Sequence, residues 1–435
     1  MTNTQRVLML AFMSLVLIML NADSNVMNPN LNLIEKEFSV TDANLGFMMG
    51  VFSIFGALIS ILWGYFADKT SRKMLFVLSV LVGEIPCLLT AFAPNYTIFF
   101  ILRILTGIGV GAAFPLVFSM IGDIYGEKSR PLATAILTTA FSLGNVIGIA
   151  LGGYTTNITW GSLTGWRIGF LLASAPNIPL AILFWILVPE PKRGASEEAT
   201  AKLIEEGILY PRTIQFSDYK KLIHIKTNVY LFIQGIIGTI PWGATAFLNK
   251  FLEDNKKLSK AAATNIFMIF ALGAILGTIF GGKWGGDLAK KNPKNLPKFC
   301  SITTAIGCSM ALATFLLIPS NLLLLSISGF LAGFFVAMTG PNMRTMLLDT
   351  NVPENRGAIF SIFNLTDSLG TGFGKWVAGV LSVAVGLTAS ISICSAFWYG
   401  CAFVLFLAAA IFPLDIAKQK ERLEEIAKKM KQQQA

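Results

Sequence analysis

Residues 123–148 read DIYGEKSRPLATAILTTAFSLGNVIG, and residues 349–374 read DTNVPENRGAIFSIFNLTDSLGTGFG. Each segment begins with an aspartate and carries an arginine fourteen residues before a glycine, with a second glycine four residues further on. The offset, 349 minus 123, is 226 residues, about half of the 435-residue chain. This match in charge and spacing predicts that the chain consists of two related halves.

The composition predicts an all-α membrane protein. Hydrophobic residues make up 54% of the sequence and charged residues only 13%, about half the share found in soluble domains. Mostly apolar runs of about eighteen or more residues recur along the chain. In lipid, each backbone polar group needs a partner inside the protein, so these runs must be helices. We predict twelve transmembrane helices in two six-helix bundles, over residues 7–30, 42–67, 73–94, 96–125, 131–156, 165–189, 228–252, 260–286, 298–318, 321–349, 356–384 and 388–414.

Polar stretches divide the chain into four parts. We predict an N-terminal six-helix bundle (1–190), a cytoplasmic linker (191–227), a C-terminal six-helix bundle (228–415) and a basic cytoplasmic tail (416–435). Lys and Arg accumulate in alternate gaps, which predicts a multi-pass protein of the cell inner membrane with both termini in the cytoplasm. One gap, with Lys256, Lys257 and Lys260, disagrees with this orientation.

Several classes of function are not expected. The net charge of +10 is spread over short gaps, so we expect contact with membrane lipids and no binding of nucleic acid. The five cysteines include no CxxC pair and His224 is the single histidine, so we expect no metal site and no cofactor. Neither GxxxxGKS nor GxxxxGKT, the motifs for nucleotide phosphates, occurs. We expect no catalytic residues and no enzyme activity.

The fifth and eighth predicted helices share a glycine pattern. Both read GxxxGxxxGG, over residues 144–153 and 273–282. Such ridges let helix backbones approach each other closely in lipid. We expect tight packing at both ridges, on faces that are smooth enough to slide or rock against their neighbours.

The exit of the second predicted helix carries a family motif. Residues 64–73 read GYFADKTSRK, which resembles the GxxxDxxxRK loop of the major facilitator superfamily. Arg103 and the glycines after it are similar to that family's RxxxGxGxG pattern. The resemblance covers both halves and implies the major facilitator fold, with Asp68 facing a helix N-terminus of the other half. The implied gating residues are Gly64, Asp68, Arg72, Lys73, Asp123, Arg130, Asp287 and Arg356.

A second, weaker resemblance concerns one branch of that family. The stretch PEPKRG at residues 189–194, together with Asp23, resembles the Spinster-like branch, which moves lysophospholipids and related amphiphiles. Two positions depart from the pattern of the branch, because Ser24 stands where it favours arginine and Val110 where it favours glutamate.

Ionisable side chains within the spans are candidates for function. Asp23 and Arg103 lie at similar predicted depths, so we expect an ion pair that is either static or opens on protonation or substrate binding. Asn21 and Asn25 suit hydrogen bonds to a polar substrate or to a hydrated cavity mouth. Glu84 is either a protonated structural group or part of a proton relay.

The second half offers a further set of candidates. Asp367 and Lys375 lie two turns apart in the eleventh predicted helix, with Asn364 one turn before Asp367. Gln234 and Trp242 flank a proline that can kink the seventh predicted helix, and Trp242 either covers a substrate or anchors the helix at the lipid interface.

These observations favour a monomeric secondary active transporter. We expect alternating access that moves a small polar or charged organic solute, with proton coupling as one option and uniport as another. The alternative is a Spinster-like transporter of lysophospholipids, other amphiphiles or drugs. A membrane-embedded enzyme and a non-transporting sensor are the competing classes, and measurement of substrate flux separates the sensor from a carrier.

Overall fold

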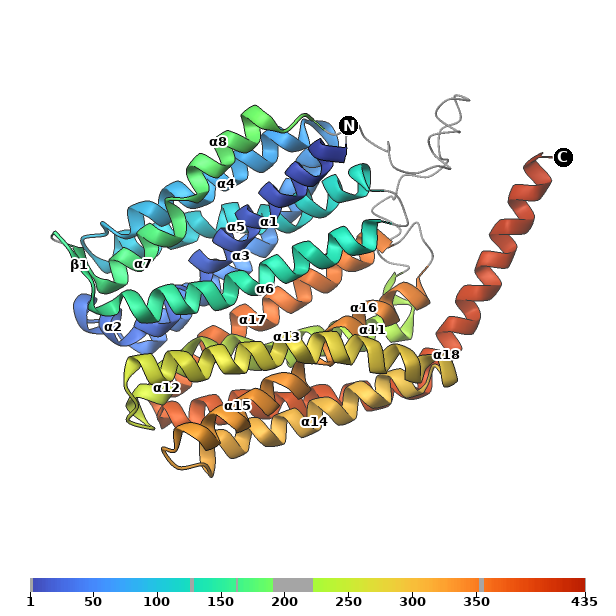
Figure 1. Cartoon of the computed structure of the whole chain (residues 1–435). Coiled ribbons are helices and arrows are strands. Elements are labelled where there is room, and N and C mark those ends of the chain that lie inside the picture. The colour runs from blue at the N-terminus through green and yellow to red at the C-terminus, as the bar shows by residue number, and fades with distance from the viewer. Residues whose placement is uncertain (1–2, 126–128, 162, 191–221, 352–355, 435) are drawn as a thin grey trace. The chain divides into compact units, whose positions relative to one another are not determined.

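The structure, a computed structural model, describes residues 3–125, 129–161, 163–190, 222–351 and 356–434 (Figure 1). Within these residues, twelve helices are long and apolar enough to cross a membrane, which confirms the predicted all-α membrane fold. The described residues also include one short antiparallel ribbon, in which β1 (Thr159–Trp160) pairs with β2 (Leu163–Thr164).

Ten helical elements of the described residues build the first six spans, and nine of them are given first. They are α1 (Asn3–Asn25), η1 (Asn28–Asn30), α2 (Leu31–Phe38), α3 (Asp42–Lys69), α4 (Arg72–Thr90), α5 (Tyr96–Ile124), α6 (Arg130–Tyr154), α7 (Gly165–Ser174) and α8 (Asn177–Leu187). A short 3-10 turn, η2 (Thr155–Asn157), follows α6. The first span is longer than the predicted 7–30, because η1 and α2 continue it to Phe38.

The last six spans follow the same plan. They are formed by α11 (Lys226–Ala244), η3 (Thr245–Phe247), α12 (Leu248–Asp254), α13 (Lys260–Lys291), α14 (Asn295–Leu316), α15 (Leu322–Ala337), α16 (Thr339–Thr350), α17 (Arg356–Val385) and α18 (Leu387–Gln434). The last helix runs without interruption through Pro413 into the basic tail.

Two compact units make up the chain. Unit 1 comprises Met1–Pro211 and Ala246–Met268, and unit 2 comprises Arg212–Thr245 and Ile269–Ala435. Residues 246–268 belong to unit 1 although they lie in the second half of the sequence. Most of the predicted linker 191–227 lies outside the described residues.

Close helix contacts repeat between the two units. A Cβ atom on Gly148 of α6 would lie 2.3 Å from the carbonyl oxygen of Ala22 on α1. At the equivalent position 226 residues later, a Cβ atom on Gly374 of α17 would lie 2.1 Å from the carbonyl oxygen of Ile240 on α11. Glycine at these positions therefore lets backbone pack on backbone, as predicted for the ridge of α6, and the packing supports the internal repeat.

The glycine ridge of α13 packs in the same way on another helix pair. A Cβ atom on Gly277 would lie 2.0 Å from the carbonyl oxygen of Phe334 on α15. In unit 1 the corresponding contact joins α5 to α3, where a Cβ atom on Gly111 would lie 2.1 Å from the carbonyl oxygen of Gly56. Both units therefore contain helix pairs that approach through glycine.

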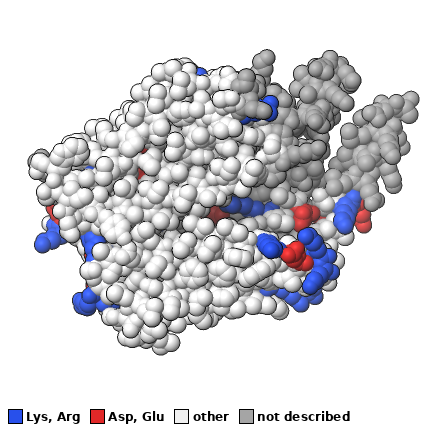
Figure 2. Space-filling model, viewed as in Figure 1, with Lys and Arg blue, Asp and Glu red and all other residues white. Residues whose placement is uncertain are grey.

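Much of the surface is apolar, as expected for helices in contact with lipid. Large side chains such as Ile61, Leu323 and Phe403 are more than half exposed, at 54%, 68% and 62%. Figure 2 shows a largely uncharged face, on which Lys, Arg, Asp and Glu gather near the left edge and in the right half. In water such an extent of exposed apolar surface would cause association, whereas lipid covers it without penalty.

Replacement of Gly148 by alanine tests the α1–α6 contact. The added methyl group collides with the Ala22 carbonyl, so Gly148→Ala should lower the unfolding free energy by about 1–3 kcal/mol, the range for overpacking. Gly286→Ala is the matched control, because a Cβ atom there meets nothing within 4 Å. The measurement is the melting temperature of each variant in detergent, and equal values for both variants would contradict the close contact.

Candidate functional site

Five buried polar side chains of unit 1 form one group, which we call the buried carboxyl cluster. They are Asp23 of α1, Glu84 and Cys87 of α4, Arg103 of α5 and Asn177 of α8, and none is more than 3% exposed. A carboxylate oxygen of Asp23, a carboxylate oxygen of Glu84 and Sγ of Cys87 all lie within 4.8 Å of one another. Four helices of one unit therefore meet at two carboxyl groups, a thiol, an amide and a guanidinium group.

The helix geometry explains why these side chains meet. Glu84 and Cys87 are three residues apart on α4 and so share one face of the helix. The neighbouring helix α5 approaches α4 through glycine, because a Cβ atom on Gly109 would lie 2.4 Å from Cα of Gly83. This short separation lets the Arg103 side chain reach across to α4 and α1.

Arg103 binds main chain and aromatic rings rather than a carboxylate. Its Nη2 donates to the backbone carbonyl of Asp23 at 3.3 Å, and its Nη1 donates to Sγ of Cys87 at 3.6 Å. The guanidinium group also lies 4.8 Å from the ring centre of Phe52 and 5.1 Å from that of Phe170. Asp23 and Arg103, the two residues expected to pair, are therefore neighbours. The hydrogen bond between them joins Arg103 to the main chain of Asp23, because depth along a helix does not determine where a carboxylate points.

Three acceptor atoms of the cluster have no hydrogen-bond donor. Asp23 Oδ1 accepts from Oγ of Ser24 at 3.1 Å, and Glu84 Oε1 accepts from Nδ2 of Asn177. The other oxygens, Asp23 Oδ2, Glu84 Oε2 and Asn177 Oδ1, are buried and have no hydrogen-bond partner among the residues that the structure describes. Each such atom costs about 1–3 kcal/mol when it stays unsatisfied, so a proton on one of the two carboxyl groups would stabilise the cluster.

A proton fits this site better than a metal ion. The ligand atoms of Asp23, Glu84 and Cys87 lie close enough together to hold a cation. The guanidinium group of Arg103 stands beside them, however, and its positive charge opposes a second cation in a medium of low dielectric constant. One proton shared by the two carboxyl groups would both supply a donor and balance the single arginine.

The asparagines beside Asp23 contact another helix. Nδ2 of Asn21 donates to the Phe141 carbonyl at 2.5 Å and to Oδ1 of Asn145 at 2.8 Å. Nδ2 of Asn25 donates to the same Asn145 oxygen at 2.7 Å and to the Asn21 carbonyl at 2.9 Å. The amide donors of Asn21 and Asn25, expected to serve a polar substrate or a hydrated cavity mouth, thus bond within unit 1, where they tie α1 to α6.

In unit 2, two acceptor atoms on neighbouring helices lack partners. Gln234 of α11 donates to Sγ of Cys401 at 3.5 Å, and its Oε1 is buried without a donor. Oδ1 of Asp367 on α17 is also buried without a partner. It lies close to α11, since a Cβ atom on Gly235 would be 3.0 Å from it. The structure brings these two predicted residues to adjoining helix faces.

The remaining candidates of unit 2 are more exposed. Trp242 packs edge to face on Trp398 with ring centres 5.8 Å apart, so at least part of its surface serves packing. Asn364 is exposed on α17, and Lys375 is half-buried two turns beyond Asp367 on the same helix.

The comparisons with known proteins agree with this architecture. The sequence model of the Major Facilitator Superfamily matches residues 13–317 and 231–432. The chain belongs to this superfamily. It is 24% identical to the uncharacterized MFS-type transporter YwfA of Bacillus subtilis over 85% of this chain and 84% of that protein. It is 22% identical to the protein spinster of Drosophila melanogaster over 81% of this chain and 58% of that protein.

A solved structure shares the fold. A bacterial homolog of the human lysosomal transporter Spinster, in an inward-facing and unoccupied conformation, superposes with a TM-score of 0.85 over 95% of this chain and 99% of that chain. The sequence identity is 21%, so the likeness concerns the fold. Together with the family match, it confirms the predicted major facilitator fold and its resemblance to the Spinster-like branch.

The superfamily motif of residues 64–73 lies at the junction of α3 and α4. Glu190, from the PEPKRG stretch, accepts hydrogen bonds from the backbone N–H of Arg72 at 3.0 Å and from the hydroxyl group of Ser71. A carboxylate thus lies at the N-terminus of α4, where it suits the helix dipole. Lys73 Nζ lies 4.8 Å from the ring centre of Trp185.

Of the other gating candidates, only Asp287 has its side chain within the described residues. Asp287 at the end of α13 forms an exposed ion pair with Lys290 at 3.1 Å. The side chains of five further candidates lie outside the described residues, namely Gly64, Asp68, Asp123, Arg130 and Arg356.

Two members of the cluster, Cys87 and Asn177, were not among the residues predicted from the sequence, nor was the proximity of Glu84 to Asp23. Cys87 is a small residue in an apolar helix and gives no signal of its own. Asn177 does give one, because it is the single amide in the apolar helix α8, which reads NIPLAILFWIL. A lone amide in such a helix needs a buried partner, and Glu84 was the nearest unassigned candidate.

Replacement of Asn177 tests how Glu84 is held. Asn177→Leu removes the donor to Glu84 Oε1 and should lower the unfolding free energy by about 1–3 kcal/mol. The double variant Glu84→Met/Asn177→Leu should recover most of the loss, because apolar partners of similar size leave no unsatisfied group.

Ser174→Ala serves as the control, because the Ser174 hydroxyl group donates to the Phe170 carbonyl of its own helix. Melting temperatures in detergent give the comparison. Additive losses in the double variant would contradict a direct contact between Asn177 and Glu84.

Proposed function

We propose that this protein is a secondary active transporter that uses alternating access and couples solute movement to protons at the buried carboxyl cluster. The observation that carries the proposal is the set of three buried acceptor atoms without donors, on Asp23, Glu84 and Asn177. A membrane carrier with such a site has a place for a proton in the middle of its first unit.

The charge of the cluster changes with its proton. With one carboxyl group protonated, the remaining carboxylate balances Arg103, and the added hydrogen supplies a donor for an unsatisfied oxygen. Without the proton, two carboxylates face one guanidinium group, and the cluster carries a net negative charge in an apolar surrounding. Loss of the proton therefore favours any conformation that brings water or another donor to Asp23 or Glu84.

The arrangement offers a route from proton to helix movement. Asp23 lies on α1, and α1 packs on α6 through backbone contacts at glycine such as Gly148. The Asn21, Asn25 and Asn145 amides tie the same two helices together, so α1 and α6 would shift as one body. Protonation then biases the position of α1, and a proton gradient biases the two states of the carrier.

For the substrate, the leading proposal is a small polar or charged organic solute. It rests on polar groups of unit 2, namely exposed Asn364, half-buried Lys375 and the unsatisfied oxygens of Asp367 and Gln234. We place the protein as a monomer in the cell inner membrane, with both termini in the cytoplasm.

An amphiphile is the second candidate. It is favoured by the likeness in fold to the Spinster homolog and by the hydrogen bonds that engage Asn21 and Asn25 within unit 1. A carrier of this kind needs fewer polar groups for its substrate, because much of the ligand surface is apolar.

A ligand screen by thermal shift separates the two substrate classes. Stabilisation should grow with ligand concentration and reach about 2.7 kcal/mol at a hundred times the dissociation constant. We expect shifts with a water-soluble acid, amino acid or sugar that shrink in Lys375→Gln or Asn364→Ala. Lys298→Gln, a change at an exposed lysine, is the control. Shifts with lysolipids alone, unchanged in these variants, would instead favour the amphiphile.

Transport by the reconstituted protein tests the coupling. In proteoliposomes, Asp23→Asn and Glu84→Gln should each reduce accumulation driven by a pH gradient by about 5- to 150-fold, the range of a coupling free energy of 1–3 kcal/mol. Exchange of labelled for unlabelled solute at equal pH should continue, because exchange needs no net proton movement.

Glu421→Gln, at an exposed position of α18, is the control and should transport normally. Full accumulation by both cluster variants would rule out proton coupling at this site.

A further inference from the structure

Residues 246–268 join spans seven and eight at the ends that the predicted orientation places outside. They belong to unit 1. They include α12 and the first turns of α13, whereas α11 and the remainder of α13 lie in unit 2. A segment of the second sequence half is therefore held by elements of the first half. The polar contacts described below join it to residues of unit 1.

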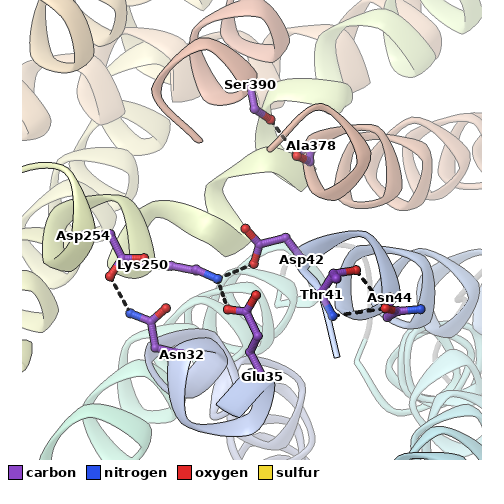
Figure 3. Close-up of polar contacts among 9 residues, drawn as sticks. All are labelled: Asn32, Glu35, Thr41, Asp42, Asn44, Lys250, Asp254, Ala378 and Ser390. Carbon is purple, nitrogen blue, oxygen red and sulfur yellow. Dashed lines mark hydrogen bonds and ion pairs between the residues drawn. The ribbon is translucent and has the colours of Figure 1, made fainter. Parts of the chain in front are cut away.

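Lys250 of α12 is the centre of these contacts. Its Nζ donates to Oδ1 of Asp42 at 2.5 Å and to Oε2 of Glu35. In Figure 3 the lysine side chain points from α12 towards both carboxylates. The side chains of Lys250 and Asp42 are only 7% and 8% exposed, and that of Glu35 is 31% exposed. One ammonium group thus joins α2 and the N-terminus of α3 to α12.

Two further contacts fasten the same segment. Nδ2 of Asn32 on α2 donates to Oδ1 of Asp254 at the end of α12, at 2.8 Å (Figure 3). On α13, Asn265 accepts a hydrogen bond from the hydroxyl group of Tyr154 at the end of α6. The segment is therefore attached on two sides, with its charged contacts concentrated at Lys250.

This arrangement suits a contact that breaks and reforms. Buried ion pairs add little net stability compared with apolar packing, because each charge loses its water. At the end of a span, however, the separated charges can regain water, so opening costs less there than in the middle of the bundle. An apolar contact of the same size would remain unfavourable to open, since it would expose its surface to water.

We propose that Lys250, Glu35 and Asp42 form an outer clamp, which holds the outer ends of spans seven and eight on the first half and releases them when the carrier opens outwards. The proposal rests on alternating access as part of the proposed function, but it does not depend on proton coupling. The clamp sets how often the outer side opens, and it takes no part in binding the proton at the buried carboxyl cluster.

Labelling of an introduced cysteine tests the clamp directly. Asn249 lies beside Lys250 on α12, is 0% exposed and donates to Oγ1 of Thr264 at 3.1 Å, so it becomes accessible only when the segment moves. Asn249→Cys is introduced into the full-length protein, which is purified in detergent and treated with a polar maleimide. Mass spectrometry of the peptide containing residue 249 gives the labelling rate at that position alone.

Loss of the lysine charge should speed this labelling. In the Asn249→Cys background, Lys250→Met should raise the rate at least about tenfold, which corresponds to 1.4 kcal/mol of lost attraction. Lys250→Arg, which keeps the charge and the donors, should label within about twofold of the parent. Lys257→Gln is the matched control, because Lys257 is an exposed lysine next to the same helix and should leave the rate unchanged.

A variant with all three clamp residues uncharged keeps the test possible if Lys250→Met fails to fold. That substitution leaves two buried carboxylates without their cation, whereas Glu35→Gln/Asp42→Asn/Lys250→Met leaves no charge uncompensated. The neutral variant should be folded by gel filtration. It should also label about tenfold faster, because methionine cannot replace the hydrogen bonds that Lys250 donates to positions 35 and 42. Labelling at the parent rate in the folded neutral variant would overturn the clamp and make the cluster a fixed structural contact.

The labelling experiment can fail or succeed independently of the transport experiment that tests the proposed function. Labelling needs neither a substrate nor a pH gradient. Proton-driven transport together with unchanged labelling would overturn the clamp alone, and faster labelling in a carrier without proton-driven transport would overturn the coupling alone.

Discussion

The absence of water in the membrane is the constraint on which the rest of this structure depends. Every backbone N–H and C=O group of a span must find its partner inside the protein, and only continuous helices provide this in a single segment. The twelve spans follow from that requirement. With the backbone satisfied, the remaining free energy of helix association comes from close packing, which explains why α6 meets α1, and α17 meets α11, through glycine.

The same constraint gives meaning to the few polar side chains inside unit 1. A buried carboxyl oxygen without a donor is costly in any protein and more so in lipid, where water cannot relieve it. Asp23 and Glu84 nevertheless lie together, beside one arginine that binds the main chain and two aromatic rings. Packing alone does not require such a group, whereas a carrier that takes up and releases a proton does. The Asn21, Asn25 and Asn145 amides show the contrasting case, in which polar groups satisfy one another and fix two helices.

Sequence reasoning succeeded where the signal was local. Apolar runs predicted the spans, glycine spacing predicted the close contacts of α6 and α13, and the stretch at residues 64–73 indicated the family. Prediction was less successful where the result depends on how a helix is rotated about its axis or on contacts between segments distant in sequence. The similar depths of Asp23 and Arg103 predicted their proximity but not the bond to the main chain. Nothing in the sequence marked Cys87, and residues 246–268 group with unit 1 through contacts that only the folded chain reveals.

Infrared spectroscopy of the purified protein would test most directly whether the buried carboxyl cluster holds a proton. A protonated carboxyl group absorbs at a different infrared wavenumber from a carboxylate, and its band shifts slightly in deuterated water. The two forms can therefore be told apart in the protein without a substrate. The account predicts a carboxylic acid band at neutral pH that is lost in the double variant Asp23→Asn/Glu84→Gln and retained in Asp367→Asn. A spectrum in which the double variant keeps the full band, or in which the wild type has none, would contradict it.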